Sequence, residues 1–195
     1  MGEIKLHKKL EIIFVVAAIV IYIIAASLVS LNRFWQYNAF WYDFGIFDET
    51  VWQLSNFKLP IIPNLYPPHG RIVWSDHFNP STILLVPFYW FTQKAEVILV
   101  AQALFVGLSA GIAYLISLQK VKSKVVRISL LSSYLGYVGL QNALFTDVHN
   151  VVFSLLPLTI TIWAIYQKKW ILYFLFFLIT LGFQENLAAV GIGLG

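Results

Sequence analysis

The sequence predicts an all-α protein, namely a polytopic bundle of transmembrane helices with a folded helical loop lying against the outer face of the membrane. Of its 195 residues, 59% are hydrophobic and only 11% are charged, whereas a soluble domain usually carries about 25% charged residues. Long apolar runs alternate with short basic clusters, and most acidic and histidine side chains fall at the ends of those runs. We therefore interpret residues 1–195 as a single membrane domain of the cell membrane.

Composition and short motifs exclude several function classes. The net charge of +4 does not indicate nucleic-acid binding, because the basic residues lie in small clusters beside apolar segments. The chain has no cysteine, so disulfides and thiolate chemistry are excluded. It also has no Walker loop, no HExxH and no GxSxG, which leaves ATPase, zinc-protease and hydrolase-elbow functions without local support.

The first predicted span is residues 12–31, which follow a short basic N-terminus. This apolar run of about 20 residues is long enough to cross about 30 Å of hydrocarbon. A signal peptide has a shorter apolar core of roughly 7–15 residues. Residues 25–27 (Ala-Ala-Ser) resemble a cleavage site, so a cleaved signal is the alternative, but we favour an uncleaved span.

Further spans are predicted over residues 97–119, 128–145, 151–166 and 170–183, and residues 187–195 look like the beginning of another. The chain is therefore expected to end inside an architecture that normally continues. Basic clusters set the orientation, because Lys and Arg favour cytoplasmic loops. Placing Lys5, Lys8, Lys9, Lys120, Lys122, Lys124, Arg127, Lys168 and Lys169 inside puts the N-terminus in the cytoplasm and residues 32–96, 147–150 and 184–186 outside.

The outer loop, residues 32–96, is rich in aromatic residues and is expected to pack on the bilayer. Phe44, Phe47, Val51 and Leu54 recur at spacings of three and four, which predicts a helix lying flat over residues 42–57. Residues 81–91 (STILLVPFYWF) are apolar but too short to span comfortably, so we interpret them as an interfacial helix; a shortened span is the alternative.

The candidate functional residues are the ionisable side chains that this topology places on the outer side. Each has a plain alternative, such as a solvated helix face, a turn or a helix cap, but polar groups at membrane depth are costly and so indicate function. Such a cluster suits general base catalysis, divalent cation binding or ion relay. Arg71 is available for an anionic head group, and the metal-ligand candidates are Asp48, Asp147 and His149. The full set is Asp43, Asp48, Glu49, Arg71, Asp76, His77, Asp147, His149 and Glu185.

Several of these residues lie in motifs that resemble a known family. The motifs are YDFGIFD at 42–48 followed by Trp52, DHF at 76–78 with Pro80, Gln102, D-x-H at 147–149, and QEN at 184–186. In this order they look like the motifs of the polytopic "domain of unknown function 2079" membrane proteins. The similarity runs from about residue 42 to the end of the chain.

The resemblance implies a fold of the GT-C superfamily of membrane glycosyltransferases, which use lipid-phosphate-linked sugars. Asp48-Glu49-x-x-Trp52 is similar to the superfamily's acidic pattern in the first outer loop. By that likeness Asp48 is the first candidate general base, Glu49 a supporting acid and Asp43 the second candidate. By the same analogy, Asp76 and His77 would bind the acceptor or the phosphate, and Asp147, His149 and Glu185 would line the cavity.

The expected function is thus a GT-C-like module that transfers a sugar from a polyprenyl-phosphate donor at the outer leaflet, with membrane lipids as partners and a divalent cation as a candidate cofactor. Two alternatives stay open. One is a transporter or lipid-translocating protein, which would need a polar path through the spans. The other is a non-catalytic or truncated membrane module, since relatives of this kind have more spans.

Overall fold

A computed structural model describes residues 2–39, 41–63 and 70–194. It is 79% helical, which confirms the prediction of a helical chain. The elements are α1 (Gly2–Trp35), α2 (Trp41–Ser55), β1 (Ile61–Ile62), β2 (Arg71–Ile72), η1 (Val73–Ser75), η2 (Pro80–Leu85), α3 (Val86–Phe91), α4 (Glu96–Lys120), α5 (Lys124–Leu135), α6 (Val138–Thr146), α7 (Asn150–Phe153), α8 (Leu155–Tyr166), α9 (Trp170–Leu181), η3 (Glu185–Leu187) and α10 (Ala188–Leu194).

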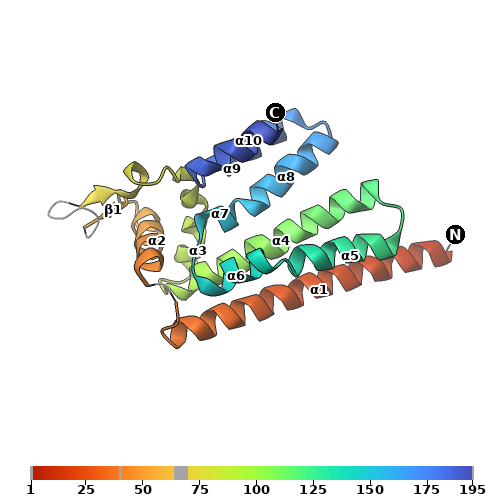
Figure 1. The fold of residues 1–195 in the computed structure, drawn as a ribbon, viewed down its shortest axis with the longest axis horizontal. Coiled ribbons are helices and arrows are strands. Elements are labelled where there is room, and N and C mark those ends of the chain that lie inside the picture. Colours follow the sequence, from red (N-terminus) through yellow and green to blue (C-terminus); the bar gives the residue numbers. More distant parts are fainter. Residues whose placement is uncertain (1, 40, 64–69, 195) are drawn as a thin grey trace.

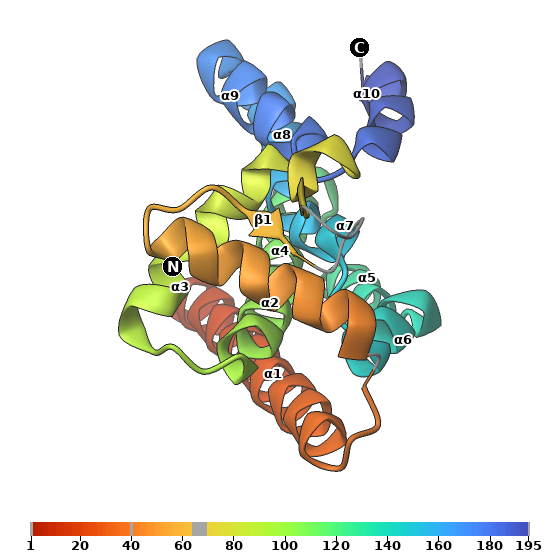
Figure 2. The ribbon, with the colours of Figure 1, turned by 90° about the vertical axis from the view of Figure 1, so that its left-hand side faces the viewer.

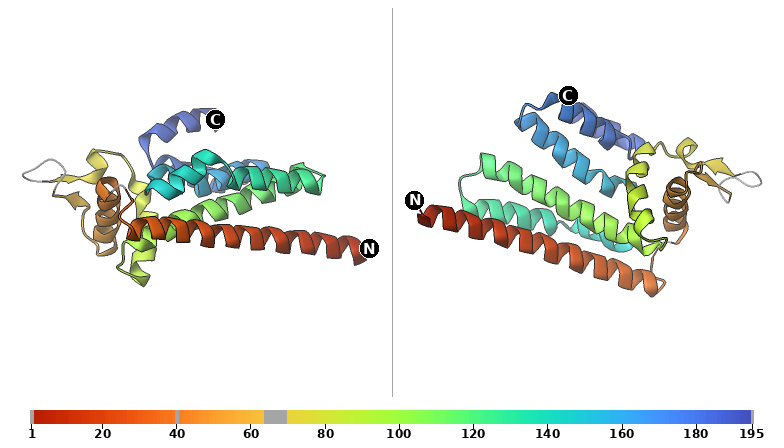
Figure 3. Two further views of the ribbon diagram at one scale, coloured as in Figure 1. Left: turned by 60° about the horizontal axis from the view of Figure 1, so that its bottom comes forward. Right: turned by 180° about the vertical axis from the view of Figure 1, so that it is seen from behind.

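The longer helices run along the long axis of the molecule (Figure 1). The N-terminus, the α4–α5 connection and the α8–α9 connection lie at one end, and α2, the β strands and α3 lie at the other. Views from two further directions show the same separation of the ends (Figure 3). This arrangement gathers the segments that carry the candidate residues at a single end of the bundle.

Helix α4 is the central element of the bundle, and it packs against α1, α5 and α8. Within the described ranges, two helical segments are long and apolar enough to cross a membrane, Lys9–Trp35 and Glu96–Lys120. In the first, 17% of the most apolar window is buried, against 61% in the second. Helix α1 therefore offers most of its apolar surface to its surroundings, as a lipid-facing helix would.

The close packing of α1 on α4 depends on Gly107. A Cβ atom built at Gly107 would lie 2.3 Å from the side chain of Ile23 and 3.4 Å from that of Ile19. Both isoleucines belong to α1. A larger residue at position 107 would therefore require the Ile23 side chain to move.

Helices α2 and α3 lie across the end of the bundle instead of along it (Figure 2). The predicted flat helix over residues 42–57 corresponds to α2, whose Phe44 and Val51 are buried in the main core with Leu85, Tyr89 and other residues. Strands β1 and β2 pair antiparallel, Ile61 with Ile72 and Ile62 with Arg71. No strand was predicted there, because two-residue strands leave no periodicity to detect.

The segment over residues 128–145, predicted as one span, is divided into two helices. Helix α5 ends at Leu135, and α6 begins at Val138 after an extended residue, Tyr137 (φ −63°, ψ 119°). The side chain of Gln141 donates to the carbonyl oxygen of Leu135, which the break leaves without a helical partner, and to the hydroxyl of Tyr22 at 3.1 Å. The segment over residues 151–166 is similarly divided into α7 and α8 at Ser154.

A buried ionic cluster closes the end of the bundle that lies opposite α2. The carboxylate of Glu11 in α1 accepts hydrogen bonds from Arg127 of α5, at 2.5 Å from Nη2 and 2.9 Å from Nε, and from the hydroxyl of Tyr114 in α4. Arg127 also donates to the carbonyl oxygens of Val121 and Lys122, each at 2.9 Å. Glu11 is only 5% exposed, so three helices are joined by charged groups held away from solvent.

We expect Arg127→Met to destabilise the protein more than its control variant does, because it removes the cation that pairs with the Glu11 carboxylate. The measurement is the free energy of unfolding in detergent micelles. The control is Lys122→Met, which removes an exposed charge at the same end of the bundle, and the double variant Glu11→Met/Arg127→Met should recover much of the loss. An Arg127→Met protein as stable as the control would contradict this role.

Candidate functional site

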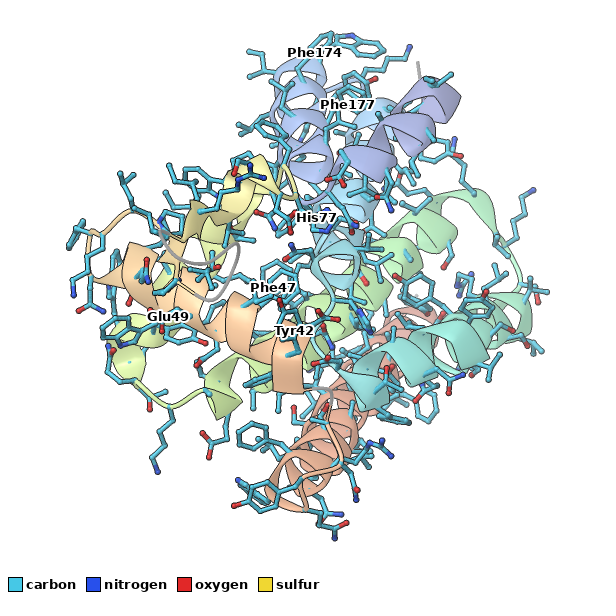
Figure 4. All side chains as sticks on the ribbon, turned by 60° about the vertical axis from the view of Figure 1, so that its left-hand side comes forward. Tyr42, Phe47, Glu49, His77, Phe174 and Phe177 are labelled. Carbon is cyan, nitrogen blue, oxygen red and sulfur yellow. The ribbon has the colours of Figure 1, made fainter. Side chains whose placement is uncertain are left out.

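A cavity of about 780 Å³ lies at the end of the bundle where α2 crosses it. Its walls come from α2, from the segment around η1 and η2, from the end of α6, and from the turn that leads into α7. Side chains of Tyr42, Phe47 and His77 lie around the middle of this end, and Glu49 lies further along α2 (Figure 4). The lining residues are Tyr42, Asp43, Ile46, Phe47, Val73, Asp76, His77, Asn79, Ala143, Val148, His149, Asn150, Val151, Val152 and Gln184.

Asp43 lines the cavity together with the two histidines, which come from two other segments of the chain. Its charge is a minor contribution to the raised pKa of His77, after the hydrogen bond with Glu185, and to that of Asp147, after burial; it only partly opposes the lowering of the pKa of His149 by burial. Asp43 lies in the first turn of α2, and its side chain is exposed within the cavity lining. A general base must be able to reach the proton that it removes, and the accessible carboxylate of Asp43 in this cavity meets that requirement.

Asp147 and His149 are held in place by Gln102 of α4. The fully buried Gln102 amide donates to the carbonyl oxygen of Asp147 at 3.0 Å, and its oxygen accepts the backbone N–H of His149 at 2.8 Å. Burial raises the pKa of Asp147 to about 6, although a hydrogen bond from the N–H of Val148 opposes the shift. Burial lowers the pKa of His149, so its imidazole is neutral at pH 7.

His77 and Glu185 form an ion pair at the rim. Nδ1 of His77 lies 2.9 Å from Oε1 of Glu185. This hydrogen bond raises the pKa of His77 and lowers that of Glu185. Both side chains are more than half exposed, 58% and 51%, so the pair adds little to stability and chiefly links the segment before η2 to η3.

Two asparagines of the cavity wall were not foreseen from the sequence. Asn79 and Asn150 are 1% and 5% exposed, and in each the Oδ1 atom has no hydrogen-bond donor among the described residues. Buried polar atoms are normally paired. The only sequence signal for them is their position, because Asn79 follows the Asp76-His77 motif and Asn150 follows His149.

Five of the nine predicted site residues lie outside the cavity lining, namely Asp147 and Glu185, described above, and Asp48, Glu49 and Arg71. Oδ1 of Asp48 accepts a hydrogen bond from the hydroxyl of Tyr89 at 2.6 Å, and burial raises the pKa of Asp48. Glu49 accepts a hydrogen bond from Gln53 at 2.6 Å. Arg71 lies exposed on β2. Since Asp43 and Asp48 are five residues apart on α2, they point to different sides of that helix.

The described part of the chain contains no group of three or more His, Asp and Glu side chains that could hold a metal ion. The three metal-ligand candidates, Asp48, Asp147 and His149, therefore do not form a shared metal centre there. One oxygen of Asp147 already accepts the Val148 N–H at 2.7 Å, and Asp48 is bonded to Tyr89. We accordingly assign no step to a metal.

Gln102→Leu should destabilise the protein by about 1–3 kcal/mol, because it leaves two buried backbone groups of the 147–149 turn without partners. The free energy of unfolding in detergent micelles measures this. The matched control is Gln119→Leu, at an exposed position on the same helix whose amide pairs with Gln167. Equal losses in the two variants would show that the Gln102 contacts do not hold the turn.

Asp147 should make stability fall as pH rises from about 4 to about 6. Its pKa is about 6 in the folded protein against an ordinary value of 3.8 for an aspartate, so over this window the folded state binds a proton that the unfolded state has lost. Melting temperatures of the wild type and of Asp147→Asn, compared between pH 4 and pH 7, isolate the effect. The wild type should lose stability relative to the variant and then level off; a constant difference would contradict the assignment.

Comparison with protein families gives a match to the family described as predicted membrane protein (DUF2079), over residues 33–195. Curated proteins give no match, and neither do solved structures. The matched region contains α2, α4 and every wall of the cavity. With most of its length matched, the chain belongs to the DUF2079 family of predicted membrane proteins.

Proposed function

We propose that this membrane protein is a multi-pass module with a cytoplasmic N-terminus that transfers a sugar from a polyprenyl-phosphate donor to an acceptor hydroxyl at the outer leaflet. The observation that carries the proposal is the cavity whose lining brings together Asp43 and Asp76 with His77 and His149. The resemblance of the outer-loop motif to GT-C glycosyltransferases supports the choice of donor.

The charge distribution supports the orientation. The basic residues Lys120, Lys122 and Lys124 lie at the α4–α5 connection, and Lys168 and Lys169 lie at the α8–α9 connection. Both connections lie at the end of the bundle opposite the cavity, together with the N-terminus (Figure 1). Positively charged loops favour the cytoplasm, so the cavity would face the outside.

In the proposed reaction Asp43 acts as general base. Its carboxylate takes the proton of the acceptor hydroxyl while that oxygen forms a bond to C1 of the sugar. The bond between C1 and the phosphate oxygen breaks, and polyprenyl phosphate leaves with the electron pair. The proton on Asp43 then passes to water. Positioned proton transfer of this kind contributes roughly 10²–10⁴-fold to a rate.

The remaining residues have supporting roles in this proposal. The neutral imidazole of His149 and the carboxylate of Asp76 orient hydroxyl groups, and Asp147 supports the turn that carries His149. Arg71 is two residues from Val73, which lines the cavity, so it is the candidate to meet the donor phosphate. The role of base passes from Asp48 to Asp43, because the Asp48 carboxylate is bonded to Tyr89.

Asp43→Asn should lower turnover about 100-fold or more, because an amide cannot accept the hydroxyl proton. The assay uses vesicles that contain the protein, a radiolabelled polyprenyl-phosphate hexose and a membrane lipid extract as acceptor, and it measures released polyprenyl phosphate and labelled product. The matched control is Asp48→Asn on the same helix, which should stay within a few-fold of the wild type. Full activity in Asp43→Asn, or a wild type without turnover, would refute the proposal.

A further inference from the structure

The polar cavity continues into an apolar groove along the bundle. The groove, of about 530 Å³, runs between α5–α6 on one side and α7–α8 on the other. Ala143, Val151 and Val152 line both the cavity and the groove. From this junction the groove extends past Leu140 and Leu155 as far as Leu130 of α5.

The chemistry changes sharply at the junction. No charged side chain lies among the described residues that line the groove, and its polar members are hydroxyl groups only. The break between α5 and α6 contributes Tyr137 and Gly139 to this wall. The groove thus suits an acyl or isoprenoid chain, which needs apolar contact and no hydrogen-bond partners.

The cavity, in contrast, selects a head group that donates hydrogen bonds and carries no negative charge. Its lining presents the carboxylates of Asp43 and Asp76 and the unpaired, buried Oδ1 atoms of Asn79 and Asn150. Among the described lining residues there is no Lys or Arg to neutralise an anion. An acceptor head group that carried a phosphate would place a further negative charge beside these carboxylates, in addition to the donor phosphate that Arg71, outside the lining, would meet. Sugar or glycerol hydroxyls would instead donate to Asp43 and to the Oδ1 atoms of Asn79 and Asn150.

From these observations we infer that the cavity and groove together bind one amphipathic acceptor, a lipid whose head group is uncharged and rich in hydroxyls. The head lies in the cavity and the tail lies in the groove between α6 and α7–α8. The role of this lipid as acceptor rests on the proposed function. Its binding to the cavity and groove can be tested without any turnover.

The test compares two photoreactive lipids in phosphatidylcholine vesicles that contain the full chain. Both carry the same diazirine acyl chain; one is a monoglucosyl diacylglycerol and the other is phosphatidic acid. After irradiation, mass spectrometry compares labelling around Leu140 and Leu155 with labelling around Ile171 and Leu178, which are 89% and 65% exposed on α9. We expect the glucosyl lipid to label the groove about tenfold more than phosphatidic acid does, and both to label α9 equally.

Ala143→Trp provides the matched variant, because it fills the junction between cavity and groove. It should abolish the groove preference of the glucosyl lipid, whereas Leu108→Trp, at a 44% exposed position of α4 that lines neither, should keep it. Asn79→Ala, which removes an acceptor without adding volume, should reduce the preference even if Ala143→Trp does not fold.

Equal groove labelling by the two lipids would show ordinary boundary lipid and overturn the inference, and so would a preference for phosphatidic acid. Either result together with Asp43-dependent turnover would leave the transfer proposal standing with a different acceptor. Selective groove labelling without any turnover would support the lipid site and refute the transferase.

Discussion

The candidate site depends first on the two hydrogen bonds that Gln102 makes from the middle of the buried helix α4 to the 147–149 turn. A polypeptide turn that enters a packed bundle must find partners for its N–H and C=O groups, because water does not reach them. The Gln102 amide supplies one donor and one acceptor in a single side chain. In this way the central helix of the bundle fixes the turn that carries Asp147 and His149.

The second constraint is the crosswise placement of α2. A helix that lies over the end of a bundle can bury one face, here with Phe44 and Val51, and still present its first turn to a cavity below. Asp43 therefore remains accessible while the opposite carboxylate, Asp48, is covered and bonded to Tyr89. The positions of Asp43 and Asp48 on α2 therefore determine that Asp43, and not Asp48, is accessible from the cavity.

Much of this arrangement is predictable from sequence, because apolar length and basic loops determine where each segment begins and ends. That reasoning located Asp43, Asp76, His77 and His149 at one end, where they line the cavity. It could not decide which of Asp43 and Asp48 lies in the cavity, because the direction of each side chain depends on how α2 packs on the bundle. It also missed the break at Tyr137 and the buried Glu11–Arg127 pair, because the compensating partners are distant in sequence. Likewise α1, α2 and α8 are each followed by a non-glycine residue with positive φ, at Tyr37, Phe57 and Lys168, where a sequence search would look for glycine.

The close contact between α1 and Gly107 of α4 has a consequence for the order in which the chain is synthesised and packs. Ile19 and Ile23 of the first helix pack against Gly107, which the ribosome adds only some eighty residues later. Until then α1 has few protein neighbours and must be solvated by lipid alone, which its largely apolar surface permits. The segment from α2 to α3 is synthesised during this interval, before the bundle beneath it is complete.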